Sequence, residues 1–127
     1  MILKKVNHIA IIVSNFEISK DFYVNKLGFQ IIHQIDRPER HSSVLYLNAG
    51  NVIIELFSFP SPPERPSYPE ACGLRHLAFD VENFDEAIGK LNNLEIETEP
   101  VRIDDRTGKK MTFFKDPDDL PLEICEV

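Results

Sequence analysis

Two histidines and two glutamates recur at one spacing, and side chains of these kinds bind metals or move protons. His8 precedes Glu55 by 47 residues, and His76 precedes Glu123 by the same 47 residues. Imidazole nitrogens and carboxylate oxygens together form a ligand set that suits divalent first-row metals. A carboxylate that can leave such a metal is also a base within reach of a substrate. These four residues are therefore the first candidates for a functional site.

Each of the four residues also has an ordinary structural interpretation. A histidine on an apolar strand is commonly a hydrogen-bonded core residue, and a glutamate at a strand end commonly lies at the rim of a sheet. However, Glu55 lies within the apolar run VIIELF and Glu123 within LPLEIC, where an unpaired carboxylate is costly to bury. Because two carboxylates share this unusual setting, a metal site is favoured over a purely structural polar cluster.

The common spacing belongs to an internal repeat. When the chain is shifted by 68 residues, His8 falls on His76, and five of the eleven positions in that region are identical. Glu55 falls on Glu123 in the same register without a gap. A repeat at a fixed period indicates one structural unit used more than once. We therefore expect two modules that each supply one histidine and one glutamate.

Each copy begins with a segment typical of a strand and continues with a helix. The segments VNHIAIIV and LRHLAFDV are rich in the branched and aromatic residues that favour strands. Ser14 with Glu17, and Asn83 with Glu86, have the spacing of a helix cap followed by an acid. The helix faces expected to lie on the sheets are Ile18, Phe22 and Leu27 in the first copy, and Phe84, Ala87, Ile88, Leu91 and Leu94 in the second.

Three further extended segments complete each copy. They are expected over residues 29–37, 43–48 and 52–59, and then over 96–103, 110–115 and 120–126. Gly28 provides a left-handed exit from the first helix, and turns are expected in NAGN and DPDD. The sequence thus predicts an α+β fold of two tandem βαβββ modules. One face of each sheet would lie under its helix, and the other would be free to form a metal-binding cup.

The two modules are joined by the proline-rich segment FPSPPERPSYPE, which can neither continue a helix nor lie in a central strand. We expect one domain over residues 1–127, with module one at about 1–59, a linker at 60–69 and module two at about 70–127. Alternation of side chains along the strands places His8, Glu55, His76 and Glu123 on the free faces. If the modules pair about a pseudo-twofold axis, the four groups converge.

Composition limits the classes of function. The 127 residues are 43% hydrophobic with a net charge of −7, which fits a globular domain and argues against a nucleic-acid partner. No apolar run is long enough for a membrane span or a signal-peptide core, so we expect a cytoplasmic protein without a membrane partner. Cys72 and Cys125 lack a CxxC spacing, so we expect two ordinary thiols, with a single bridge between them as the alternative.

The tandem pattern, the segments HIAIIV and HLAFDV and the closing KDPDDLPLEI resemble the vicinal oxygen chelate superfamily over nearly the whole chain. The order His, Glu, His, Glu is similar to that of glyoxalase I, a lactoylglutathione lyase. This resemblance implies His8, Glu55, His76 and Glu123 as metal ligands for one divalent metal per site. Zinc or nickel is favoured, with cobalt, manganese or iron as alternatives. Many relatives read DPDGN before the last ligand, where this chain has Asp119 in place of the glycine.

The resemblance also implies an activity on a small-molecule substrate. It is that of a metal-dependent lyase or isomerase of the glyoxalase I type, which acts through an enediolate on a hemithioacetal of a 2-oxoaldehyde and a thiol, or on a similar vicinal-oxygen substrate. Glu123 is expected as the base, with Glu55 as the alternative. An epimerase, an extradiol-type dioxygenase and a non-catalytic small-molecule binding protein are the rival functions. The dioxygenase is disfavoured because its chemistry needs open metal positions that a fourth protein ligand would occupy.

The resemblance further implies a homodimer whose sites take His8 and Glu55 from one chain and His76 and Glu123 from the other. Sites built within one chain are the alternative.

The chain differs from glutathione-dependent relatives at the positions that hold glutathione in those relatives. Those relatives place an arginine four residues after the first histidine ligand, where this chain has Ile12, and an asparagine shortly after the first glutamate, where it has Phe57, Ser58 and Phe59. Glutathione is therefore not the expected thiol. Basic residues that could instead bind an anionic substrate, or form a solvated rim, are Arg37, Arg40, Arg102 and Arg106. His33 and His41 are expected at the surface, and Arg65 and Arg75 are expected to order the linker.

Overall fold

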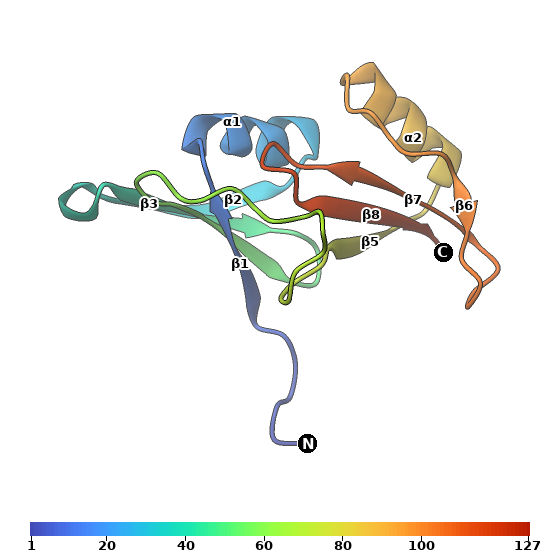
Figure 1. Ribbon diagram of the computed structural model, residues 1–127, viewed down its shortest axis with the longest axis horizontal. Helices are drawn as coiled ribbons and strands as arrows, with labels where there is room; N and C mark the ends of the chain where they lie inside the picture. Colours follow the sequence, from blue (N-terminus) through green and yellow to red (C-terminus); the bar gives the residue numbers. More distant parts are fainter. The chain divides into compact units, whose positions relative to one another are not determined.

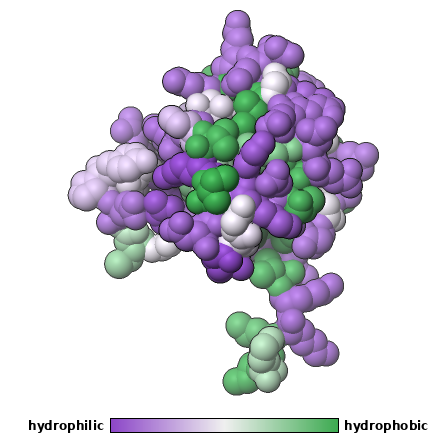
Figure 2. All heavy atoms as spheres, turned by 90° about the vertical axis from the view of Figure 1, so that its right-hand side faces the viewer, coloured by the Kyte–Doolittle hydropathy of each residue, from purple (hydrophilic) through white to green (hydrophobic).

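The computed structural model describes all 127 residues, which divide into two compact units, Met1–Glu64 and Arg65–Val127. The boundary between the units falls inside the proline-rich segment. No helix is long and apolar enough to cross a membrane. The face drawn in Figure 2 is mostly hydrophilic, with apolar side chains in small groups.

The first unit is a four-stranded sheet with a helical segment on one face (Figure 1). Its strands are β1 (His8–Val13), β2 (Gln30–Arg37), β3 (Ser42–Asn48) and β4 (Ile53–Ser58). They lie in the order β1-β4-β3-β2, with β1 parallel to β4 and the other pairs antiparallel. Helix α1 (Phe16–Lys20) continues into the π-helix η1 (Asp21–Lys26), and the short 3₁₀ helix η2 (Pro38–Arg40) joins β2 to β3.

The second unit repeats this arrangement. Its strands β5 (Leu77–Val81), β6 (Arg102–Ile103), β7 (Lys110–Lys115) and β8 (Pro121–Glu126) lie in the order β5-β8-β7-β6, and helix α2 spans Phe84–Asn93. Here too the first and last strands are parallel, because β5 pairs with β8. The predicted α+β fold of two βαβββ modules is therefore confirmed.

The helices begin at equivalent asparagines. The side-chain oxygen of Asn15 accepts a hydrogen bond from Ile18 N at 3.1 Å, and that of Asn83 accepts one from Glu86 N at 3.0 Å. The predicted cap at Asn83 is confirmed, whereas the predicted cap at Ser14 is wrong by one residue. Asn15 lies 68 residues before Asn83, so the repeat was the better guide to this helix start.

The first helical segment differs from its prediction. Its second half is a π-helix, which is wider than an α-helix. Leu27 N donates to Phe22 O at 2.9 Å, a bond that spans five residues. Tyr23 in this π-helical part is fully buried, whereas Ile18 of α1, predicted on the buried face, is 56% exposed. Gly28 then ends the segment with φ 82°, as predicted.

The predicted strand over residues 96–103 forms only as β6, which has two residues. Glu95 after α2 has φ 61°, and Pro100 has no N–H to donate to a ladder. Single hydrogen bonds hold the chain beside β7 instead. Glu99 N donates to Phe113 O at 2.9 Å, and Thr112 Oγ1 donates to Glu99 O at 2.7 Å.

In each unit the core lies on one face of the sheet and the candidate ligands on the other. In the first unit Val13, Leu45 and Leu56 are fully buried, whereas His8 is exposed. In the second unit the buried residues include Phe84, Leu91, Leu122 and Ile124. The period-2 alternation read from the sequence therefore assigns the faces correctly.

Candidate functional site

The first unit brings His8 and Glu55 together. β1 and β4 run parallel with Ala10 opposite Glu55, so His8 lies two residues earlier on the same face. His8 Nε2 lies 3.2 Å from Glu55 Oε2. Glu55 is only 9% exposed, although the imidazole beside it is largely open. A mostly buried carboxylate is thus held against one ring nitrogen.

The second unit brings His76 and Glu123 together in the same way. Ala78 of β5 lies opposite Glu123 of β8, and His76 directly precedes β5. His76 Nε2 lies 3.3 Å from Glu123 Oε2, and Glu123 is 8% exposed. The repeat seen in the sequence is therefore a repeat of side-chain geometry.

No third His, Cys, Asp or Glu side chain joins either pair within its unit. Cys125 follows Glu123 by two residues, but burial raises the pKa of its thiol, and the charge of Glu123 raises it further. The thiol is therefore protonated at neutral pH and is not a ready ligand. Each unit therefore offers two donors, one imidazole nitrogen and one carboxylate.

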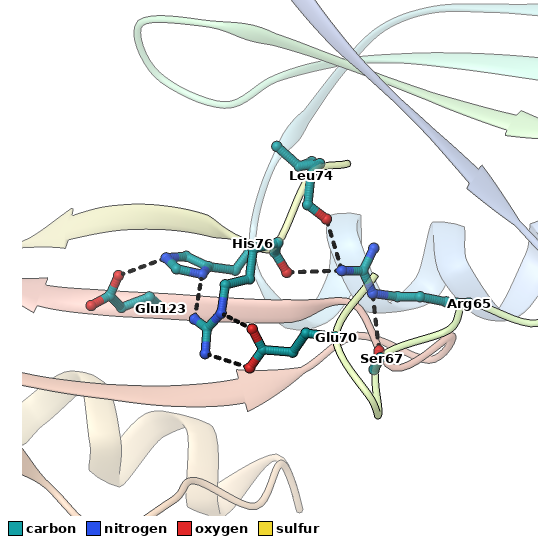
Figure 3. A network of polar contacts seen from close by, with 7 residues as sticks. Arg65, Ser67, Glu70, Leu74, His76 and Glu123 are labelled. Atoms are coloured by element: carbon teal, nitrogen blue, oxygen red, sulfur yellow. Dashed lines mark hydrogen bonds and ion pairs between the residues drawn. The ribbon is translucent and has the colours of Figure 1, made fainter. Parts of the chain in front are cut away.

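The second ring nitrogen of each histidine has a partner whose contact with the ring the sequence did not predict. His8 Nδ1 lies 2.7 Å from Asn7 Oδ1, and His76 Nδ1 lies 3.0 Å from Arg75 Nη1. Figure 3 shows the second of these networks, in which the His76 ring lies between Glu123 and a guanidinium. The only available signal was the repeat, because residues 7 and 75 are also 68 apart.

Arg75 is held by further contacts. Its guanidinium binds Glu70 through Nε–Oε2 at 3.1 Å and Nη2–Oε1 at 3.3 Å. This hydrogen bonding and the positive charge of Arg75 lower the pKa of Glu70. Arg65 donates to the carbonyl oxygens of Leu74 and Arg75 at 2.8 and 2.9 Å (Figure 3). Arg65 thus orders the segment before β5, as expected.

The donor set of the first unit fits a divalent cation. Since His8 Nδ1 faces an amide oxygen, Nδ1 carries a proton, and in the neutral ring Nε2 has a free lone pair. That lone pair and a carboxylate oxygen of Glu55 then face each other at 3.2 Å. Two electron-pair donors at this distance are the arrangement that a cation would satisfy.

The residues beside the two glutamates differ between the units. Glu55 lies opposite Tyr46 of β3, which in turn lies opposite the exposed His33 of β2. The rings of Tyr46 and His33 are 6.1 Å apart, so this surface histidine belongs to the same row of side chains as Glu55. Glu123 lies opposite Phe113, whose ring the His76 ring meets edge-on at 5.0 Å.

Two of the four predicted substrate-binding arginines lie over aromatic rings on these faces. The Arg37 guanidinium lies 5.7 Å from the ring centroid of Phe57, and that of Arg102 lies 5.4 Å from that of Phe113. Arg40 in η2 and Arg106 are exposed and have no such ring contact. His41 is exposed as well, as expected.

The turn before Glu123 keeps a left-handed residue without a glycine. Asp119 has φ 66°, a conformation that aspartate tolerates better than most residues. Asp116 stabilises the turn, because its side-chain oxygen accepts from Asp118 N at 2.8 Å and from Leu120 N at 2.9 Å. Asp119 thus occupies the left-handed position of the turn that leads into β8, the strand that carries Glu123.

Comparison with known proteins identifies the family to which the chain belongs. The chain matches the Glyoxalase/Bleomycin resistance protein/Dioxygenase superfamily over residues 5–124. YwkD of Bacillus subtilis is 58% identical over 99% of both proteins. The crystal structure of the glyoxalase family protein from Enterococcus faecalis has a TM-score of 0.91 and 54% identity, and the match covers 99% of this chain and 100% of that one.

Two enzymes are among the more distant relatives. The mitochondrial methylmalonyl-CoA epimerase of Homo sapiens is 30% identical over 98% of this chain and 73% of its own length. The lactoylglutathione lyase of Neisseria meningitidis is 27% identical over 94% of this chain and 88% of its own length.

Proposed function

Because the chain belongs to the Glyoxalase/Bleomycin resistance protein/Dioxygenase superfamily, we propose that it is a metal-dependent lyase or isomerase of the glyoxalase I type. The substrate would be a 2-oxoaldehyde–thiol hemithioacetal or a similar molecule with two neighbouring oxygens. The observation that carries this proposal is the pair of repeat-equivalent His–Glu contacts at 3.2 and 3.3 Å, each with a mostly buried carboxylate.

The metal would be held by His8, Glu55, His76 and Glu123, with one divalent ion per site. Zinc or nickel is favoured over cobalt, manganese or iron. Divalent metals are general in this superfamily, and the mixed nitrogen and oxygen donors suit them. When bound, the metal would stabilise the negative charge that develops on the substrate oxygens.

Glu123 would act as the base. Its carboxylate would accept the proton of the substrate carbon and return it to the neighbouring carbon, and Glu55 is the alternative base. The ring of Phe113 lies in register with Glu123 and is itself buried, so it limits water on one side of this carboxylate.

Arg102 and Arg37 would bind an anionic part of the substrate, because each lies over a ring on the same face as a candidate base. Arg40 and Arg106 would contribute only to the general positive charge of the loops. The sites would be shared in a homodimer, with His8 and Glu55 from one chain and His76 and Glu123 from the other.

The test combines metal analysis with turnover. Purified protein is stripped with a chelator, reloaded with one metal at a time and assayed on hemithioacetals of methylglyoxal with several thiols. Turnover that requires metal and is lost in His8→Ala and His76→Ala supports the proposal. Stoichiometric metal binding without turnover on any thiol adduct would contradict the lyase assignment.

An epimerase is the second candidate. It is favoured by the likeness to the human methylmalonyl-CoA epimerase and by Ile12, which is 57% exposed where glutathione-dependent relatives carry an arginine. The same base would remove and return a proton at one carbon instead of two. Incubation of the metal-loaded protein with methylmalonyl-CoA in D₂O distinguishes the candidates, because an epimerase exchanges the carbon-bound hydrogen for deuterium.

A further inference from the structure

We propose that Asn7 and Arg75 are positioning residues that hold the two ligand histidines in opposite tautomers. The inference rests on the proposed metal-binding role of His8 and His76. Asn7 would leave the Nε2 lone pair of His8 ready for the metal. Arg75 would keep a proton on Nε2 of His76 and must release this ring before it can bind the metal there.

For His8 the argument starts at the amide oxygen of Asn7. That oxygen only accepts hydrogen bonds, so at 2.7 Å the ring donates through Nδ1–H. In the neutral ring this is the only proton, so Nε2 is unprotonated and faces Glu55 Oε2 at 3.2 Å. Metal-bound histidines commonly donate their other N–H to such an oxygen, which fixes the ring for binding. The first unit needs no change of tautomer to bind a metal.

For His76 the argument is reversed, because a guanidinium only donates hydrogen bonds. At 3.0 Å from Arg75 Nη1, the Nδ1 atom of His76 must be the acceptor. The ring proton of neutral His76 therefore lies on Nε2, from which it is directed at Glu123 Oε2 at 3.3 Å. A metal on Nε2 would displace that proton, which would have to move to Nδ1, where the guanidinium now lies.

Arg75 is not a freely moving side chain. It makes two contacts with Glu70 (Figure 3), and its guanidinium lies 5.9 Å from the centroid of the Phe113 ring. To bind a metal through Nε2, His76 must therefore break its hydrogen bond with an arginine that other contacts hold in place. We infer that the Glu70–Arg75 pair weakens metal binding by the second half of the ligand set, and that Asn7 strengthens it in the first half.

The repeat makes the contrast specific. Residues 7 and 75 occupy the same position in the two copies, directly before the histidine, and each contacts Nδ1 of that histidine. The same backbone location thus carries an acceptor in one unit and a donor in the other. This is the difference that separates the tautomers of two otherwise matched rings.

The first test is a direct measurement of the tautomers in the metal-free protein. Long-range ¹H–¹⁵N spectra distinguish protonated from unprotonated ring nitrogens, and comparison with His8→Gln and His76→Gln assigns the signals. At a pH at which both rings are neutral, we expect Nδ1–H in His8 and Nε2–H in His76. Arg75→Met should move His76 toward Nδ1–H and leave His8 unchanged, whereas Asn7→Ala should alter His8 alone. Glu70→Gln, which keeps the arginine but loosens it, should give an intermediate spectrum for His76.

The same tautomer in both rings of the metal-free protein would overturn the inference. So would a His76 spectrum that does not respond to Arg75→Met in a variant that keeps the wild-type circular dichroism. Failure of the fold in Arg75→Met leaves Glu70→Gln as the deciding variant.

The second test measures zinc affinity by competition with a chromophoric chelator. Asn7→Ala should weaken zinc binding by about 10- to 100-fold, and Arg75→Met should strengthen it by about tenfold. Weaker zinc binding by the Arg75→Met variant would overturn the inference that Arg75 competes with the metal for His76. If zinc bound neither the wild type nor any variant, the proposed function would fail, whereas the spectra would still decide the tautomers.

Discussion

The two units share a strand order and a His–Glu pair, but they differ at the outer edge of the sheet. β2 has eight residues and pairs with β3 along its length, whereas β6 has two residues. The other three strands of each sheet keep their pairing in both units, and they carry both glutamates and position the histidines. Both His–Glu contacts therefore lie at the parallel first and last strands, away from the β2 or β6 edge at which the units differ.

A second difference concerns the residues around each glutamate. Glu55 has Tyr46 beside it in the sheet, with His33 next along the row. Glu123 has Phe113 beside it, and two guanidiniums, those of Arg75 and Arg102, lie over that ring. Cations near the second glutamate would attract an anionic substrate toward it. The units therefore differ in the number of these cations, since two guanidiniums lie over the ring beside Glu123 and one, that of Arg37, lies over Phe57 in the first unit.

The largest effect is expected from the glutamates. Glu123→Gln should lower kcat by about 10²- to 10⁴-fold, because the amide keeps an oxygen for the metal but cannot accept a proton. Glu55→Gln should lower it less. Metal content is measured on the same samples as turnover.

Two outcomes would contradict the roles expected of the two glutamates. A larger loss in Glu55→Gln, with metal retained, would transfer the role of base to the first unit. Parallel loss of metal and activity in Glu123→Gln would leave Glu123 as a ligand only.

The next effect is complementation between chains. His8→Ala and His76→Ala should each be inactive alone, because each lacks one ligand at every site. After joint unfolding and refolding, a heterodimer with shared sites has one intact site, and random mixing makes about half of the dimers mixed, so about a quarter of wild-type activity should return. If no activity returns although a dimer forms, the sites are built within one chain.

A smaller effect is expected from the arginines. Arg102→Met should raise KM by about tenfold with little change in kcat, because it removes a charge that binds the substrate equally before and during reaction. Arg37→Met should raise KM less if the second unit binds the anion. Arg106→Met is the matched control, since Arg106 has no ring contact. Equal effects of all three substitutions would indicate a general basic rim.

Much of this architecture can be predicted from the sequence, because it depends on two regularities, the alternation of side chains along the strands and the internal repeat. The period-2 alternation assigns Ile11 and Val13 to the core and His8 to the other face, and the repeat places the second copy. The contacts of Asn7 and Arg75 with the histidine rings escaped prediction because no spacing reveals which ring nitrogen a neighbouring side chain reaches. The π-helical turn at Phe22 and Tyr23 was not predicted either, since the apolar spacing of that segment also fits the period of an α-helix.

The smallest expected effect tests whether equivalent caps stabilise unequal helices. Asn83→Ala should lower the free energy of unfolding by about 1 kcal/mol, because Glu86 N loses its acceptor at the start of the ten-residue helix α2. Asn15→Ala should cost less, since α1 has only five α-helical residues and continues into the π-helix, which Tyr23 anchors in the core. Urea unfolding followed by circular dichroism measures both. Asn92→Ala, an exposed asparagine near the other end of α2, is the control and should change stability by less than about 0.5 kcal/mol. A cost for Asn15→Ala that exceeds that for Asn83→Ala would show that the first helix depends on its cap more than on the anchored aromatic residue.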